Sequence, residues 1–127
     1  MHSHLRFENP PALPHEAVAG ILEEALRDRS QEGEAAVALV GSALNDDDRE
    51  FVEHRCVQIG TRAVPGSPLL GLAGLCLGHA ARRFGCLSDE ALALAESLAA
   101  RAEADPTDVD GRALDGFDDI RSFLHLR

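Results

Sequence analysis

One long apolar run, residues 69–81, constrains the fold more than any other feature of the sequence. Ser67-Pro68 before it is a helix start signal, because Ser caps a helix and Pro fits its first position. Gly85 after it is a typical helix end. The run is shorter than the roughly 20 residues that span a membrane, and Arg82-Arg83 closes it. The sequence therefore predicts a helix over Pro68–Phe84 that other helices bury on several sides.

Three glycines, Gly71, Gly74 and Gly78, lie within this predicted helix. Each lowers helix stability by about 1 kcal/mol relative to Ala. That cost is tolerable where a second backbone comes so close that no side chain fits between them. We therefore expect tight helix packing along these glycines, inside the domain rather than at a dimer seam.

The rest of the chain has the composition of an all-α protein. Apolar residues make up 45% of the 127 positions, yet Trp and Tyr are absent and Phe occurs only 5 times. The core is therefore expected to consist of Leu, Ala, Val and Ile. Ala, Leu, Glu and Arg are strong helix formers and dominate the sequence, whereas the alternation typical of β-strands does not occur.

Start, stop and periodicity signals predict five further helices. Asp47 and Glu50 have the spacing of a capping box at the start of the third helix, and Ser88 is the expected cap of the fifth. Asp105-Pro106 ends the fifth helix, and the last one begins near Asp108. The expected ranges of the first three helices are 15–27, 31–44 and 47–63. The fifth lies between Ser88 and Asp105, and the last carries apolar residues from Val109 to Leu124. The apolar positions of the second helix are Ala36, Val37, Val40 and Leu44.

The short links between these helices indicate that sequence neighbours are antiparallel. The helix pairs recur about every 35 to 40 residues, which predicts three antiparallel hairpins stacked as two-helix solenoid repeats. A compact six-helix bundle is the alternative. Residues 1–14, which contain three prolines, are predicted to form an extended arm, and residues 15–127 a single helical domain.

The balance of acidic and basic residues disfavours some partners. The formal net charge is −10, from 22 acidic residues against 12 basic ones, all of which are Arg. Phosphate backbones and anionic lipids repel such a chain, so we expect binding neither to nucleic acid nor to membranes. A protein partner with a basic surface fits better. The acidic residues form two clusters, one of Asp46, Asp47, Asp48 and Glu50, and one of Asp108, Asp110, Asp115, Asp118 and Asp119. Arg82, Arg83 and Arg112 are candidates to form salt bridges with some of these residues.

Three cysteines, Cys56, Cys76 and Cys86, bear on redox state and metal binding. Their odd number and the lack of a leader-like segment in residues 1–14 favour reduced thiols and a cytoplasmic location. Cys76 and His79 are three residues apart, on one helix face, but zinc needs about four ligands. Cys-x-x-His in an apolar helix lacks the loop-borne cysteine pair of zinc modules, so we expect no metal.

A histidine in an apolar helix needs a hydrogen-bond partner. For His79, the carboxylates of Asp115, Asp118 and Asp119 on the last helix are candidates, which predicts a structural buried histidine. The sequence contains no Gly-rich phosphate loop, no Gly-x-Ser-x-Gly and no His-Glu-x-x-His motif. We therefore expect no catalytic residue and no cofactor.

Three segments resemble a group of small bacterial proteins with HEAT-like helical repeats. They are Asn-Asp-Asp-Asp-Arg-Glu-Phe-Val at 45–52, Leu-Gly-His-Ala-Ala-Arg-Arg-Phe-Gly at 77–85 and Gly-Arg-Ala-Leu-Asp-Gly-Phe-Asp-Asp-Ile at 111–120. The resemblance departs at Gly116 and Phe117, which interrupt the final-helix pattern of the group. It implies a short HEAT-like α-solenoid with six main helices. Such proteins are often encoded beside polymorphic or contact-dependent toxins, and several are regarded as immunity proteins.

Together these features predict a non-enzymatic protein-binding domain. The resemblance implies an immunity protein, monomeric when free, that occludes the active site of a basic toxin domain through an acidic surface. The candidate contact residues are Asp46, Asp47, Asp48, Glu50, Asp115, Asp118 and Asp119. The alternative is a HEAT-like adaptor or scaffold in an unrelated pathway. A HEAT-like DNA glycosylase is disfavoured, because those enzymes use basic, aromatic-bearing faces and this chain lacks Lys, Trp and Tyr.

Overall fold

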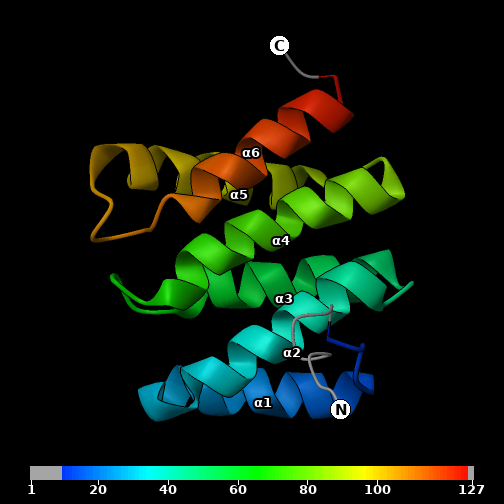
Figure 1. Ribbon diagram of the computed structural model, residues 1–127, viewed down its shortest axis with the longest axis vertical. Helices are drawn as coiled ribbons and strands as arrows, with labels where there is room; N and C mark the ends of the chain where they lie inside the picture. The colour runs from blue at the N-terminus through cyan, green and yellow to red at the C-terminus, as the bar shows by residue number, and fades with distance from the viewer. Residues whose placement is uncertain (1–9, 126–127) are drawn as a thin grey trace, which may run out of the picture.

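The computed structural model describes residues 10–125, and within that range the protein has six α-helices and no β-strand (Figure 1). A short 3-10 turn, η2 (Arg29–Gln31), lies between the first two helices. The helices are α1 (His15–Arg27), α2 (Glu32–Asn45), α3 (Arg49–Arg62), α4 (Pro68–Phe84), α5 (Asp89–Ala104) and α6 (Arg112–Phe123). The prediction of an all-α fold is confirmed.

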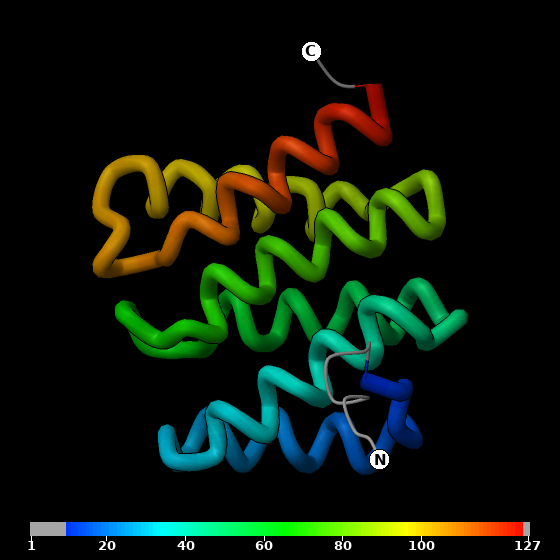
Figure 2. Tube along the Cα trace, viewed as in Figure 1, coloured from blue at the N-terminus to red at the C-terminus, as the bar shows by residue number. Residues whose placement is uncertain are grey.

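The helices form two layers. α1, α3 and α5 lie side by side in the rear layer, and α2, α4 and α6 cross in front of them (Figure 1, Figure 2). Each helix contacts its sequence neighbour, and further contacts join α1 to α3 to α5 and α2 to α4 to α6. The stack therefore begins at α1 and ends at α6, with α4 in the middle of the front layer.

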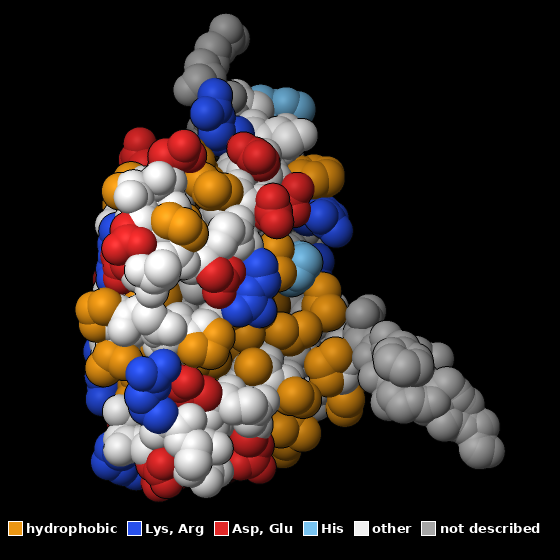
Figure 3. All heavy atoms as spheres, turned by 60° about the vertical axis from the view of Figure 1, so that its left-hand side comes forward, with side chains coloured by type: hydrophobic (Ala, Val, Ile, Leu, Met, Phe, Trp, Pro, Cys, Tyr) orange, Lys and Arg blue, Asp and Glu red, His pale blue; other side chains and the backbone are white. Residues whose placement is uncertain are grey.

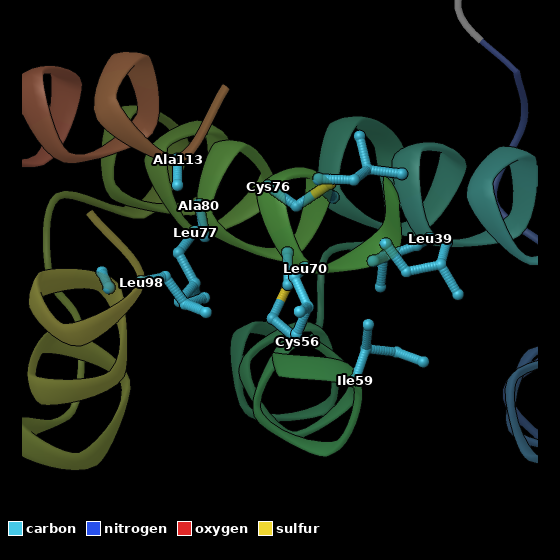
Figure 4. Packing of buried hydrophobic residues seen from close by; sticks show 14 of the residues in the cluster. Leu39, Cys56, Ile59, Leu70, Cys76, Leu77, Ala80, Leu98 and Ala113 are labelled. Atoms are coloured by element: carbon cyan, nitrogen blue, oxygen red, sulfur yellow. The ribbon is translucent and has the colours of Figure 1, made fainter. Parts of the chain in front are cut away.

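α4 is largely buried, as its apolar run predicted. It contacts α2, α3, α5 and α6, and most of its residues have little exposed surface. Leu70 of α4 lies beside Cys56 of α3, and Leu77 points toward Leu98 of α5 (Figure 4). Because four helices surround α4, its position determines where α2 and α6 lie.

The tight packing predicted for the glycines of α4 occurs against α6. A Cβ atom on Gly78 would lie 2.8 Å from the backbone oxygen of Gly116, and one on Gly74 would lie 3.0 Å from Cα of Ala113. One on Gly116 would overlap the backbone oxygen of Gly74. Gly116 departs from the pattern of the group that the chain resembles, and this close approach explains why a glycine stands there.

Several helix ends agree with the sequence signals. The hydroxyl groups of Ser67 and Ser88 accept hydrogen bonds from the N–H groups of Leu69 and Ala91, and so cap α4 and α5. Gly85 ends α4 in the left-handed region, with φ 74°. These polar and glycine signals are local, which is why they can be read without knowledge of the tertiary structure.

The predicted range of α3 began at Asp47, whereas the helix begins at Arg49. Asp48, not Asp47, is the N-cap, and its carboxylate accepts a hydrogen bond from the N–H of Phe51. Three consecutive Asp residues offer equivalent caps in sequence, and only the path of the chain between α2 and α3 selects one of them.

The predicted start of α6 was also wrong. The helix begins at Arg112 rather than near Asp108, because two Asp side chains stabilise turns before it. The carboxylate of Asp105 accepts hydrogen bonds from Thr107, and that of Asp110 accepts one from the N–H of Arg112. Such side-chain to backbone bonds compete with helix formation.

The predicted arm, residues 1–14, lies only in part within the described range. Residues 10–14 are not helical, and they pack against α2. The backbone oxygen of Pro10 accepts a hydrogen bond from Nδ2 of Asn45 at 2.6 Å, and Pro11 lies against Gly41. None of the helices in residues 10–125 combines the length and the hydropathy that crossing a membrane requires.

Candidate protein-binding face

α2 has apolar side chains on its solvent side as well as in the core. Val37 is 59% exposed, and Ala36, Val40 and Leu44 are only partly buried. The side that packs inward carries mostly small residues, namely Ala35, Ala38, Leu39, Gly41, Ser42 and Ala43. Of the apolar positions that the sequence singles out on this helix, Ala36 and Val40 lie at the edge of the core, and Val37 and Leu44 lie outside it. Apolar side chains grouped at a surface are typical of binding sites.

α4 continues this surface between α2 and α6. On this mostly buried helix, Leu75 and His79 are partly exposed and one turn apart. α2 and α6 contact α4 from its two sides, so Leu75 and His79 lie on the strip of α4 that is exposed between them. Figure 3, in which the front of Figure 1 lies to the right, shows hydrophobic side chains gathered there and acidic ones above them. We call Ala36, Val37, Val40, Leu44 and Leu75 the apolar patch.

His79 lies where the apolar patch approaches α6. Burial lowers the pKa of its imidazole below the ordinary value of 6.5, nearby Arg82 lowers it further, and Asp119 opposes both effects. The ring is therefore mainly neutral at pH 7. It is half-buried, and within residues 10–125 its buried Nδ1 atom has no hydrogen-bond partner. The expected link to an Asp of α6 is thus not seen there.

The three acidic candidates on α6 differ in how far they are engaged. Asp119 is partly buried, and its Oδ2 atom lies 2.9 Å from Nη2 of Arg82. Asp115 and Asp118 are exposed, and neither takes part in an ion pair in the described part of the chain. α6 therefore keeps two carboxylates available to a partner.

The acidic residues just before α6 are engaged by arginines. Arg101 donates two hydrogen bonds to Asp108, and Arg112 donates two side-chain hydrogen bonds to Asp110. These bonds lower the pKa of both carboxyl groups, against the opposing effect of burial. Asp108 and Asp110 stabilise the turn that leads into α6.

The acidic cluster between α2 and α3 is largely part of the structure. Asp46 is only 8% exposed, and its carboxylate accepts hydrogen bonds from Nε2 of His15 and the N–H of Asp48, each at 2.8 Å. Asp48 in turn caps α3. Asp47, Asp48 and Glu50 are all exposed, but Asp47 pairs with Arg83 and Asp48 caps the helix.

Two neighbouring arginines at the end of α4 connect the two acidic clusters. Arg82 pairs with Asp119 of α6, and Nη2 of Arg83 lies 3.1 Å from the carboxylate of Asp47. Nη1 of Arg83 also donates hydrogen bonds to two backbone oxygens near the end of α2. The fold thus brings Asp47 of the first cluster and Asp119 of the second to the C-terminal end of α4, where the arginines offset part of their charge, whereas Asp110 lies against Gly71 near the start of the helix.

The cysteines lie apart from other metal ligands. Cys56 and Cys76 are buried in the core between α3 and α4, and Cys86 is exposed (Figure 4). A hydrogen bond with Cys76, together with burial, raises the pKa of the Cys56 thiol. Across residues 10–125, no group of three or more His, Cys, Asp or Glu side chains is placed to hold a metal ion.

The apolar patch was not predicted. Both sides of α2 are apolar, so periodicity alone does not indicate which side is buried. A signal was nevertheless present, because one side consists mainly of Ala, Gly and Ser, which allow close helix packing. The larger Val37, Val40 and Leu44 lie on the other side. The sequence did indicate that Arg82, Arg83 and Arg112 pair with acidic residues, and they pair with Asp119, Asp47 and Asp110. Which carboxylate each arginine takes follows from the fold.

Comparisons with protein-family models, curated proteins and solved structures find no match to this chain. Inference about function therefore rests on the surface itself. An apolar patch next to exposed carboxylates offers apolar contact area and negative charge, which is the chemistry of a protein-binding surface.

Proposed function

We propose that this chain is a non-enzymatic protein-binding domain and acts as an immunity protein that covers the active site of a cognate bacterial toxin. The observation that carries the proposal is the apolar patch beside the exposed carboxylates of Asp115 and Asp118. Protein interfaces combine an apolar centre with a polar rim. The net charge of −10 favours the approach of a basic partner.

The resemblance to small bacterial HEAT-like proteins supports a toxin as that partner. Two of the segments that carry it, 77–85 and 111–120, correspond to the second half of α4 and most of α6. The same stretches contain His79, Asp115 and Asp118, which border or belong to the proposed binding surface.

We further infer that the three hairpins form a short HEAT-like α-solenoid. The order of the helices supports this, because alternate helices line up in each of the two layers, as they do in stacked two-helix repeats. In such a stack, one layer offers a continuous surface to a partner. The cysteines are free, which fits work in the reducing cytoplasm.

Co-expression tests the proposal directly. The C-terminal domain of the protein encoded immediately upstream is produced in a bacterial host with and without this chain. We expect that domain to arrest growth, and we expect the chain to restore growth and to co-purify with it. A domain that arrests growth but is neither bound nor neutralised contradicts the proposal. A harmless upstream product that does not bind favours the adaptor function instead.

A further inference from the structure

The apolar patch is well suited to receive another helix. Val37 is the most exposed large apolar residue in the described range, and Val40 and Leu44 continue it along α2. Leu75 of α4 widens the patch toward α6. Residues at this spacing form a ridge along the helix axis, which is the shape that the apolar face of a second helix can pack against.

The secondary structure argues against a strand as the occupant. A peptide that binds as a strand pairs its backbone with the free edge of a sheet. Within residues 10–125 the chain is helical and contains no sheet edge. A partner on this face therefore binds through side chains, and an amphipathic helix provides these on one side.

The charges beside the apolar patch indicate the charge that the flanking side chains of a bound partner helix need. Asp115 and Asp118 lie exposed on α6, next to the α4 segment that contributes Leu75 and His79. His79 is mainly neutral at pH 7, so it adds little positive charge at the border. Arg82, the nearest arginine of α4, is already paired with Asp119. Arg121 is also exposed on α6, where its guanidinium lies over the ring of Phe117. Two exposed carboxylates against this one arginine leave the charge that faces a partner over α6 negative.

We propose that the α2–α4–α6 face binds a basic amphipathic helix, whose apolar side packs on the apolar patch while Arg or Lys residues pair with Asp115 and Asp118. This rests on the proposed function and specifies the chemistry of the partner element. Charge complementarity selects this occupant over a second copy of the chain. Two copies with a net charge of −10 each repel one another.

Defined peptides and the full-length chain test this assignment. The probe is a synthetic helix of about four turns with Leu on one side and Arg on the flanks. A shuffled isomer keeps its composition without the apolar side, and an acidic version carries Glu in place of Arg. Fluorescence anisotropy gives the affinities at two salt concentrations. We expect the amphipathic basic peptide to bind at least about tenfold more tightly than either control, and more weakly at high salt.

Matched variants locate the binding surface. Val37→Gln is expected to weaken binding of the basic peptide by about tenfold, which is the size of effect seen when an interface anchor is lost. Val64→Gln is the control, because Val64 is also exposed, at 45%, but lies between α3 and α4 away from the patch. The double variant Asp115→Asn, Asp118→Asn is expected to weaken binding and to reduce its dependence on salt.

Several results would overturn the assignment. Equal binding of the shuffled peptide shows charge attraction only, and equal effects of the two valine variants place the site elsewhere. Self-association of the free chain that Val37→Gln abolishes shows that a second copy occupies the face. If the chain neutralises its toxin but Val37→Gln changes neither peptide binding nor protection, this assignment fails and the proposed function stands.

Discussion

The two acidic clusters of this protein both consist mainly of Asp residues but have different surroundings. Between α2 and α3, Asp46 is nearly buried against His15, and Asp48 caps a helix. On α6, Asp115 and Asp118 are exposed and lie beside the apolar patch. Asp46 and Asp48 of the first cluster hold two helices in place, whereas Asp115 and Asp118 of the second remain available to a partner.

Because of this difference, a cluster of acidic residues in the sequence does not by itself identify an interface; the bonds of each carboxylate decide its role. A carboxylate that accepts backbone N–H bonds stabilises its own chain, and a substitution there reports on folding. A carboxylate on an exposed helix face contributes little to stability, and a substitution there reports on binding. Variants in both clusters therefore separate the two roles, and the expected effects fall in the following order.

The largest loss of stability is expected from a substitution that displaces α6 from α4. Gly116→Ala places a methyl group against the backbone of Gly74, and neither backbone can retreat without displacing α6. We expect a loss of about 2–3 kcal/mol in the free energy of unfolding, measured by denaturant titration. Gly20→Ala is the control, since its added methyl group meets nothing within 4 Å, and it should increase stability slightly. Equal stability of Gly116→Ala and the wild type would contradict the close packing of α4 and α6.

A smaller loss is expected in the first acidic cluster. Asp46→Ala removes the acceptor for His15 and for the N–H of Asp48 in a nearly buried position. We expect a loss of about 1–3 kcal/mol in the free energy of unfolding. Asp118→Ala, the matched change on α6, should leave the unfolding midpoint close to that of the wild type. Similar losses for both variants would remove the distinction between the clusters.

The smallest effect is expected in the pH dependence of folding stability, through His79 beside the second cluster. The pKa of His79 is below its ordinary value in the folded state, so the unfolded chain takes up a proton there first as pH falls. Folding stability attributable to His79 should therefore decline as pH falls through 6.5. The difference in stability between the wild type and His79→Gln, followed from pH 7.5 to pH 5.5, isolates it from the other histidines. If the wild type instead became more stable relative to His79→Gln as the pH falls, the prediction would be contradicted.

Local signals in the sequence predicted much of the fold. Ser67, Ser88 and Gly85 indicated helix ends because their bonds are made within a few residues. The glycines of α4 indicated a close approach, although only the structure identifies α6 as its partner. The start of α6 was missed because Asp105 and Asp110 bond to the backbone ahead of it, an alternative that composition does not distinguish from a helix start.

The candidate site was predictable only in part. Sequence indicated Asp115 and Asp118, which are exposed, but grouped them with Asp46 and Asp48, whose carboxylates bond within the domain. Which carboxylates are engaged depends on partners such as His15, which lie far away in the sequence. The sequence also named the apolar positions of α2, but their exposure follows from how α2 packs on α4.

The measurement that tests the central claim most directly compares two charge-matched double variants in binding to the toxin domain. Asp115→Asn, Asp118→Asn removes two exposed charges of α6, and Asp47→Asn, Glu50→Gln removes two exposed charges of the other cluster. Isothermal titration calorimetry gives Kd for each, with thermal unfolding as the check on folding. The first variant is expected to raise Kd at least about tenfold and the second less than about twofold. The reverse order, or equal effects, would contradict the assignment of the binding surface to the α2–α4–α6 face.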